Sequence, residues 1–232
     1  MRRTLVLAGG DFAPSVLDGI ALDGARVVCV DRGLAHCLAA GLVPDLLVGD
    51  LDSVSPGALE RADLARLPRL EFPVEKDASD LELALRTLAE ERGAAVPEEV
   101  VVAGVSGGRT DHFLFNWLLP ASRSWPFALK LVDASVEAVV VTPRYPFAAS
   151  GVPGRTFSLL PLGSVRGVTT DGLRYALVGA TLAPGTTRGL SNVVAATAVS
   201  VRVEEGMLLA LAARANAEGG APRTFATTGE GG

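Results

Sequence analysis

Residues 25–53 read ARVVCVDRGLAHCLAAGLVPDLLVGDLDS, and this stretch decides the fold class. The apolar run at 25–30 predicts a buried strand, and residues 33–41 predict a helix that ends at a glycine. A second apolar run at 45–49 predicts another strand. Strands that alternate with helices pair in parallel and carry helices on both faces. We therefore expect an open α/β sheet.

The same alternation continues through the first 134 residues. The expected strands are 4–9, 25–30, 45–49, 70–74, 99–105 and 127–132. The expected helices are 33–41, 55–67, 79–93 and 111–121. Residues 1–134 are accordingly predicted to form an α/β domain with a mostly parallel, Rossmann-like sheet.

The pattern changes after residue 135, where short β-rich segments are separated by Gly and Pro and no helical period is found. Residues 135–214 are predicted to form an all-β antiparallel sandwich. Within it, residues 199–213 are predicted to form a hairpin that turns at Glu205 and Gly206. Residues 215–232 are rich in Gly, Ala and Thr, and we expect this tail to be disordered.

Composition and the cysteine pattern argue against nucleic-acid binding, membrane association, zinc binding and disulfide bonds. The 232 residues carry a net charge of −5 and no cluster of basic residues, so we expect no nucleic-acid binding. No apolar stretch approaches about 18 residues, and the apolar start is too short and polar for a signal peptide, so we expect no membrane association. Cys29 and Cys37 form no CxxC motif, which argues against zinc and disulfides. A cytoplasmic protein is expected.

Acidic residues follow the ends of several predicted strands, where ligands bind in open parallel sheets. They are Asp31, Asp50, Asp52, Asp77 and Asp80. Asp50 and Asp52 are two positions apart and point to one side of an extended backbone. Carboxylate oxygens are the ligands that Mg²⁺ prefers, together with water and substrate phosphates. We predict a Mg²⁺ site at Asp50 and Asp52, with Asp31, Asp77 and Asp80 at neighbouring strand ends.

Ordinary local structure is the alternative for these residues. The GDLDS segment could be a turn in which Asp side chains cap backbone amides. Ser79 and Glu82 fit a capping box at a helix start, and an acidic residue such as Asp80 is also favoured there by the helix dipole. Neither alternative accounts for acidic residues at so many neighbouring strand ends.

Residues 104–116, GVSGGRTDHFLFN, form the second informative stretch. Its paired glycines allow a sharp turn into a helix, whose free amides can hold phosphate oxygens. Arg109 at that turn can bind phosphate bidentately. His112 and Asn116 share a helix face, although His112 could simply be a polar residue at a packed helix end. No Walker A motif is present, so nucleotide binding would need another construction.

Weaker signals lie elsewhere. Tyr175, Ser191 and Asn192 could pack on and hydrogen-bond a heterocycle, or could serve ordinary turn chemistry. Trp117 is predicted to be a core residue. His36 lies away from the apolar face of its helix and is predicted to be solvated.

The ordered motifs resemble the thiamine pyrophosphokinase (thiamine diphosphokinase) family. The segments that carry the resemblance are DRGLAHCLAAGLVPDLLVGDLDS at 31–53, KDASDLELAL at 76–85, GGRTDHFLFN at 107–116, DGLRYAL at 171–177 and GLSN at 189–192. The resemblance implies an α/β domain, a β-sandwich domain and a homodimer with the site at the subunit interface. It also implies Mg²⁺-dependent transfer of pyrophosphate from ATP to the hydroxyl of thiamine, giving thiamine diphosphate and AMP.

The resemblance implies roles for individual residues. The implied catalytic residues are Asp50, Asp52, Asp80, Arg109 and Asp111. The implied Mg²⁺ ligands are Asp50, Asp52 and Asp77 or Asp80. The implied ATP-binding residues are Asp31, Lys76, Ser106, Gly108, Arg109, Asp111, His112 and Asn116. The implied thiamine-binding residues are Tyr175, Ser191 and Asn192. The sequence departs from the family at Arg32, where the family's DGG turn reads DRG.

Two alternative functions remain open at this point. One is a related pyrophosphokinase that acts on 6-hydroxymethylpterin, whose N-terminal half would look much the same. The other is a non-catalytic thiamine or nucleotide sensor, which predicts loss of metal ligands that are all present here. A plain phosphohydrolase is more distant, because it would not need a second domain to hold a heterocycle.

Overall fold

The computed structural model describes residues 2–50, 64, 66–91 and 96–214. The chain divides into two units, residues 1–133 and 134–232. Most of the helix expected at 55–67 and the whole of the tail at 215–232 lie outside the described residues. No described helix is long and apolar enough to cross a membrane.

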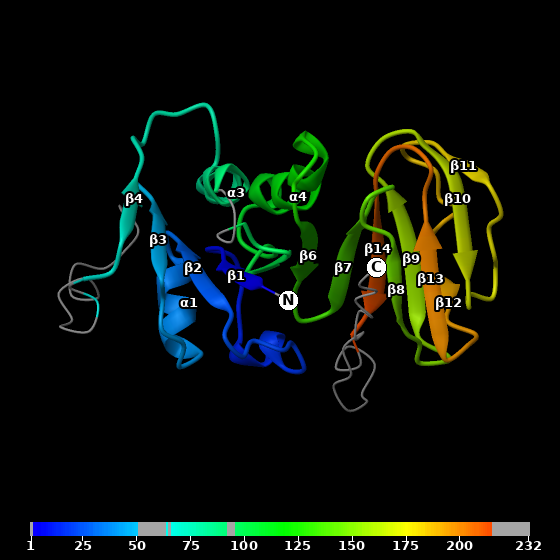
Figure 1. Ribbon diagram of the computed structural model, residues 1–232, viewed down its shortest axis with the longest axis horizontal. Coiled ribbons are helices and arrows are strands. Elements are labelled where there is room, and N and C mark those ends of the chain that lie inside the picture. The colour runs from blue at the N-terminus through cyan, green and yellow to red at the C-terminus, as the bar shows by residue number, and fades with distance from the viewer. Residues whose placement is uncertain (1, 51–63, 65, 92–95, 215–232) are drawn as a thin grey trace. The chain divides into compact units, whose positions relative to one another are not determined.

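The first unit is built on a parallel sheet with strand order β6-β5-β1-β2-β3-β4 (Figure 1). The strands are β1 (Arg3–Leu7), β2 (Arg26–Val30), β3 (Leu46–Gly49), β4 (Arg69–Glu71), β5 (Glu99–Ala103) and β6 (Ala128–Val132). The helices are η1 (Pro14–Leu17), α1 (Gly33–Ala39), α3 (Asp80–Glu90), α4 (Thr110–Leu118) and η3 (Leu119–Ser122). Because all strand pairs are parallel, their carboxyl ends share one edge of the sheet.

Helices cover both faces of this sheet. On one face, Leu34 and Cys37 of α1 pack into a buried cluster with Leu5 and Leu7 of β1. On the other face α3 contacts β2 and β3, and its buried residues recur at helical spacing (Figure 1). Those residues are Leu81, Ala84, Leu85 and Leu88. Alternate residues of each strand therefore enter opposite halves of the core.

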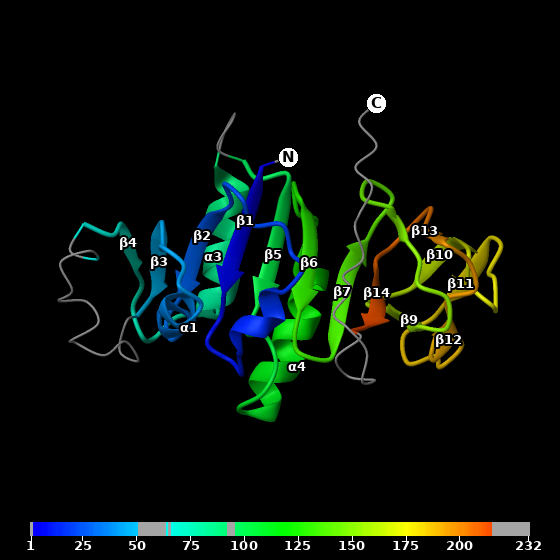
Figure 2. The same ribbon diagram turned by 90° about the horizontal axis from the view of Figure 1, so that it is seen from below.

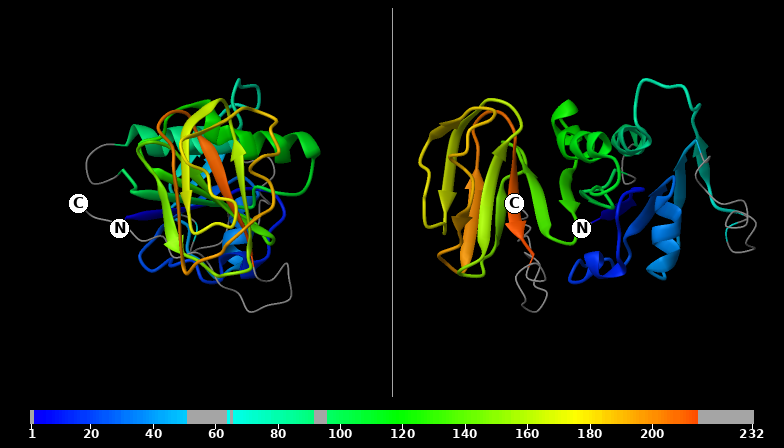
Figure 3. Two further views of the ribbon diagram at one scale, coloured as in Figure 1. Left: turned by 90° about the vertical axis from the view of Figure 1, so that its right-hand side faces the viewer. Right: turned by 180° about the vertical axis from the view of Figure 1, so that it is seen from behind.

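The second unit consists of antiparallel strands in two sheets (Figure 3). The strands are β7 (Val136–Val141), β8 (Phe147–Ser150), β9 (Thr156–Pro161), β10 (Val165–Asp171), β11 (Ala180–Leu182), β12 (Asn192–Val193), β13 (Ala198–Arg202) and β14 (Leu208–Ala213). One sheet has the order β12-β9-β14-β7 and the other β11-β10-β13-β8.

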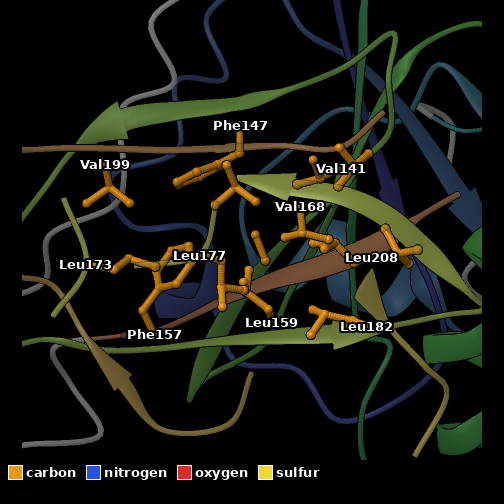
Figure 4. Packing of buried hydrophobic residues seen from close by; sticks show 14 of the residues in the cluster. Val141, Phe147, Phe157, Leu159, Val168, Leu173, Leu177, Leu182, Val199 and Leu208 are labelled. Carbon is orange, nitrogen blue, oxygen red and sulfur yellow. The ribbon is translucent and has the colours of Figure 1, made fainter. Parts of the chain in front are cut away.

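Both sheets contribute side chains to one apolar core. Phe157 and Leu208 come from the first sheet, and Phe147, Val168 and Val199 come from the second (Figure 4). Two antiparallel sheets packed over a shared core form a β-sandwich. The predicted fold class, a parallel α/β domain followed by an antiparallel β-sandwich, is confirmed.

The prediction that residues 199–213 form a hairpin is wrong. β13 pairs with β8 and β10, whereas β14 pairs with β7 and β9 in the other sheet. The segment around Gly206, which has φ of +88°, crosses between the sheets instead of joining neighbours. Both strands have one buried face in either arrangement, so their alternation does not distinguish a hairpin from a crossing.

Candidate functional site

The loops that follow β1 and β5 are held together at the carboxyl edge of the sheet (Figure 2). The Gly10 amide donates to the Gly104 carbonyl at 2.9 Å, and the Asp11 amide donates to the Ser106 carbonyl at 2.7 Å. A Cβ atom on Gly10 would lie only 2.3 Å from the Ser106 carbonyl oxygen. Glycine at position 10 therefore lets two strand-end loops approach closely.

Asp31 lies where β2 ends and adopts a left-handed backbone conformation, with φ of +48°. Its amide donates to the Val48 carbonyl at 3.0 Å. Its carboxylate rests against Gly49, because a Cβ atom there would be 1.6 Å from Asp31 Oδ1. Asp31 Oδ1 is buried and accepts no hydrogen bond from any residue that the structure describes. A buried carboxylate oxygen without a donor is unfavourable unless a ligand completes it.

Lys76 lies between two further carboxylates of this edge. Its Nζ is 2.9 Å from Asp80 Oδ1 and 3.5 Å from Asp50 Oδ2. The three side chains are about equally buried, with 14–16% of their surface exposed. The ammonium thus separates two like charges that would otherwise repel each other.

The acidic surroundings change the ionisation of this cluster. Burial raises the pKa of Asp31 to about 7, assisted by the negative charges of Asp80 and Asp50 and opposed by Lys76. Burial lowers the pKa of Lys76, but hydrogen bonds and charges from Asp80 and Asp50 outweigh burial and raise it overall. Perturbed groups that face one another at a strand edge are typical of functional sites.

Ser79 caps the helix that carries Asp80. Its hydroxyl accepts a hydrogen bond from the Glu82 amide at 3.2 Å, as predicted. The Glu82 carboxylate forms an ion pair with Arg86, at 2.5 Å. The cap fixes the first turn of α3 and with it the position of Asp80.

The glycine-rich loop after β5 turns through Gly107 and Gly108, with φ of +80° and +66°. Arg109 and Asp111, both exposed, form a bidentate pair with Nε–Oδ1 at 3.1 Å and Nη2–Oδ2 at 2.6 Å. Asp111 Oδ1 also accepts from the His112 amide at 3.0 Å. The Arg109 hydrogen bond, followed by that amide, lowers the pKa of Asp111.

Two polar residues near this loop hold its shape. The Ser106 hydroxyl donates to Asp133 Oδ2 at 2.6 Å and accepts from Trp117 Nε1 at 3.3 Å. The Asn116 side chain donates to the Val105 carbonyl at 3.2 Å. These bonds anchor α4 to the end of β5, so the amides of the loop have a fixed place.

In the second unit, Asn192 ties two turns together. Its Oδ1 accepts from the amides of Tyr175 and Val193 at 3.1 and 2.8 Å, and its Nδ2 donates to the Tyr175 carbonyl at 2.8 Å. Asn192 is buried, whereas Tyr175 and Ser191 are exposed beside it. Ser191 has φ of +56°, and its amide donates to Ser158 Oγ at 3.0 Å.

Comparison with known proteins matches both units to one family. Residues 22–122 match the catalytic-domain model of thiamin pyrophosphokinase, and residues 147–208 match its vitamin B1 binding-domain model. The chain belongs to the thiamine pyrophosphokinase family. Its sequence is 28% identical to the thiamine pyrophosphokinase of Bacillus subtilis (strain 168) over 196 residues, which cover 83% of this chain and 89% of that protein.

Solved structures agree with this assignment. The thiamine pyrophosphokinase of Bacillus subtilis superposes with a TM-score of 0.76 at 25% identity, covering 91% of this chain and 99% of that one. The enzyme of Geobacillus thermodenitrificans gives 0.71 at 27%, covering 92% and 97%. The Candida albicans thiamin pyrophosphokinase, at 14% identity and a TM-score of 0.68, shares the fold and covers 91% of this chain and 90% of its own.

In this chain, some predicted metal ligands come together and others do not. Asp50 and Asp80 share Lys76, and Asp31 faces them. Asp77 is exposed, and Asp52 lies outside the described residues. Within the described ranges, no three carboxylate, imidazole or thiol side chains are already arranged as ligands of one ion.

The sequence analysis predicted that His36 is solvated, and this prediction is wrong. The His36 ring is partly buried, its Nε2 lies 2.8 Å from the Gly10 carbonyl, and it packs against Phe12 with ring centroids 5.0 Å apart. It therefore braces the Gly10 loop from α1. The partners lie 24 and 26 positions away, so helical periodicity carried no signal for them. Trp117 is buried, as predicted.

Proposed function

We propose that this protein transfers pyrophosphate from ATP to the hydroxyl of thiamine, giving thiamine diphosphate and AMP. The observation that carries the proposal is the cluster of Asp31, Asp50 and Asp80 around Lys76 at the carboxyl edge of the parallel sheet. This cluster lies within the match to the catalytic domain, and a vitamin B1 binding domain follows it in the chain.

The two units divide the substrates between them in this proposal. Residues 1–134 bind ATP and Mg²⁺ at the strand ends, and residues 135–214 bind thiamine. Tyr175, Ser191 and Asn192 are the proposed thiamine side. In support, Asn192 holds the Tyr175 turn in place from within, while the side chains of Tyr175 and Ser191 stay accessible.

The described carboxylates fit a Mg²⁺ ion. Asp31 Oδ1 is a buried oxygen without a hydrogen-bond donor among the described residues, and the ligand set of Asp31, Asp50 and Asp80 consists of hard oxygens. Asp50 and Asp80 would hold the ion, and Asp52 and Asp77 remain proposed ligands on the basis of sequence. When bound, the ion would supply positive charge that offsets the charge of the phosphate oxygens.

The side chains of this chain would align the reactants. Lys76 and Arg109 would bind phosphate oxygens, together with the amides of the Ser106–Gly108 loop and the neighbouring His112 and Asn116. The thiamine oxygen attacks the β-phosphorus, the bond from that phosphorus to the oxygen of AMP breaks, and AMP leaves.

The hydroxyl proton passes to a carboxylate of the site. Asp80 and Asp111 are the two candidates for the proton acceptor, and each is paired with a cation, Asp80 with Lys76 and Asp111 with Arg109. Arg109 lowers the pKa of Asp111, which makes its carboxylate a weaker base.

A homodimer with the site at the subunit interface is also part of the proposal. In support, α4 leaves three apolar side chains at least half exposed, namely Leu114, Phe115 and Leu118. A second copy of the chain would bury them. A cytoplasmic location is proposed as well, because Cys29 and Cys37 are both free thiols.

Product analysis tests the proposed reaction. Incubation with ATP, MgCl₂ and thiamine should yield AMP and thiamine diphosphate in equal amounts by chromatography. A parallel reaction with 6-hydroxymethylpterin as acceptor should yield neither product. Formation of ADP, or of AMP only with the pterin, would refute the assignment.

A further inference from the structure

Arg32 lies between the ends of two neighbouring strands at the carboxyl edge. A Cβ atom on Gly33 would be 1.8 Å from the Leu7 carbonyl oxygen, so the start of α1 is pressed against the end of β1. A Cβ atom on Gly9 would be 3.3 Å from Arg32 Cβ. The Arg32 side chain therefore starts directly over the turn that follows β1, and it is exposed.

The backbone at Arg32 is relaxed. Its φ and ψ are −59° and −15°, which is the ordinary right-handed region open to any residue. The left-handed step is made one position earlier, by Asp31 with φ of +48°. An arginine at position 32 thus leaves the path of the loop unchanged and adds a cationic side chain to this edge.

Lys76 and Arg109, the two cations already proposed to bind phosphate, also have carboxylate partners that offset part of their charge. Lys76 contacts Asp50 and Asp80, and Arg109 is paired bidentately with Asp111. Arg32 forms no ion pair with any residue in the described part of the chain. Its guanidinium remains available to a ligand at the ends of β1 and β2.

We propose that Arg32 binds the phosphate chain of ATP, an assignment that rests on the proposed use of ATP by this chain. A triphosphate that approaches Asp31, Asp50 and Asp80 meets like charges, and one divalent ion offsets only part of its charge. The planar guanidinium matches two phosphate oxygens at once and supplies the missing positive charge. Arg32 is accordingly a substrate-binding residue for the phosphates and has no role toward adenosine.

Calorimetric titration of the full chain with ATP and with adenosine, both in MgCl₂, tests this assignment. Arg32→Gln should weaken ATP binding about tenfold, as expected for the loss of a charge-assisted hydrogen bond, and should leave adenosine binding unchanged. Arg32→Lys should recover part of the ATP affinity. Arg202→Gln is the matched control, because Arg202 is exposed in the β-sandwich and carries the same charge.

Equal ATP affinity in the Arg32→Gln and Arg202→Gln proteins would overturn the assignment. An equal loss of ATP and adenosine affinity in Arg32→Gln would also overturn it, because the residue would then act on the nucleoside or on the fold. Direct binding keeps this test separate from the proposed reaction. A wild-type protein that binds ATP through Arg32 but makes no thiamine diphosphate would refute the reaction alone.

Discussion

Two polar clusters of this molecule differ in how completely their hydrogen bonds are satisfied. At the edge of the parallel sheet, Asp31 Oδ1 is buried without a hydrogen-bond donor among the described residues, and Asp50 and Asp80 share the ammonium of Lys76. In the β-sandwich, both ends of the buried Asn192 amide are bonded to backbone. The first cluster is strained by its own charges, whereas the second is complete without a ligand.

This difference in hydrogen bonding distinguishes residues that bind a ligand from residues that hold the binding residues in place. A buried polar atom without a partner destabilises the folded state, so such an atom persists where a ligand completes it. A fully bonded side chain has little capacity left for substrate, and it contributes by holding neighbouring groups in place. On this basis we propose that Asp31, Asp50 and Asp80 contact ligand through their oxygens and that Asn192 acts through Tyr175.

The largest effect is expected for Asp50→Asn. Loss of one carboxylate removes a proposed Mg²⁺ ligand, and we expect kcat/KM to fall at least about a hundredfold. The free energy of unfolding should stay within about 1 kcal/mol of wild type, because one of several mutually repelling charges is lost. Steady-state kinetics and urea denaturation measure the two quantities.

The control for this change is Asp23→Asn, at an exposed position in the loop before β2. It should leave both quantities unchanged. Near-normal turnover of Asp50→Asn would remove Asp50 from the metal site and would weaken the contrast between the two clusters.

A smaller effect is expected for Asn192→Ala. The change removes three hydrogen bonds to backbone, and the free energy of unfolding should fall by about 2 kcal/mol. Release of the Tyr175 turn should raise KM for thiamine while KM for ATP is unchanged. Asn192→Asp keeps the acceptor for the Tyr175 and Val193 amides, so its free energy of unfolding should lie between those of the wild type and Asn192→Ala. An unchanged stability would mean that Asn192 is not part of the framework.

Lys76→Gln should lower the free energy of unfolding by about 1 kcal/mol in the absence of metal, because Asp50 and Asp80 lose the cation between them. Saturating MgCl₂ should restore much of this loss by binding the same oxygens. Arg202→Gln, which changes the charge equally elsewhere, should show neither effect. If Mg²⁺ stabilised the two variants equally, the carboxylates around Lys76 would not be its site.

The smallest expected effect concerns pH and His36. Burial lowers the pKa of His36, aided by the charge of Arg32 and opposed by the Gly10 hydrogen bond and by Asp11. The unfolded chain therefore binds a proton more readily, so the stability that His36 contributes is present above its ordinary pKa of about 6.5 and lost as pH falls below it. In His36→Gln, the free energy of unfolding should therefore change less with pH between about pH 7 and pH 5 than it does in the wild type. A profile identical to wild type would show that His36 does not titrate on unfolding.

The fold was predictable because its signals are local. Strand and helix periods distinguish the parallel unit from the β-sandwich, and acidic residues after strands mark the carboxyl edge. The crossing between β13 and β14 was missed, because the strand pattern on either side of Gly206 is the same for a hairpin and for a change of sheet.

The sequence placed the proposed site residues after the ends of strands, but it could not predict the hydrogen bonds they form. The contact of His36 with Gly10 and the bonds of Ser106 with Asp133 join segments more than 20 residues apart, and no local pattern encodes them. Likewise, the sequence of a turn does not show whether the amide of an asparagine contacts a ligand or the backbone of another loop, as it does at Asn192.

The most direct test of the central claim is the Mg²⁺ dependence of ATP binding, measured by titration calorimetry on the wild-type and Asp50→Asn proteins. We predict that ATP binds the wild type tightly only when Mg²⁺ is present, and that Asp50→Asn loses most of the gain that Mg²⁺ provides. ATP affinity that is the same with and without Mg²⁺, or a gain that Asp50→Asn retains in full, would contradict the account.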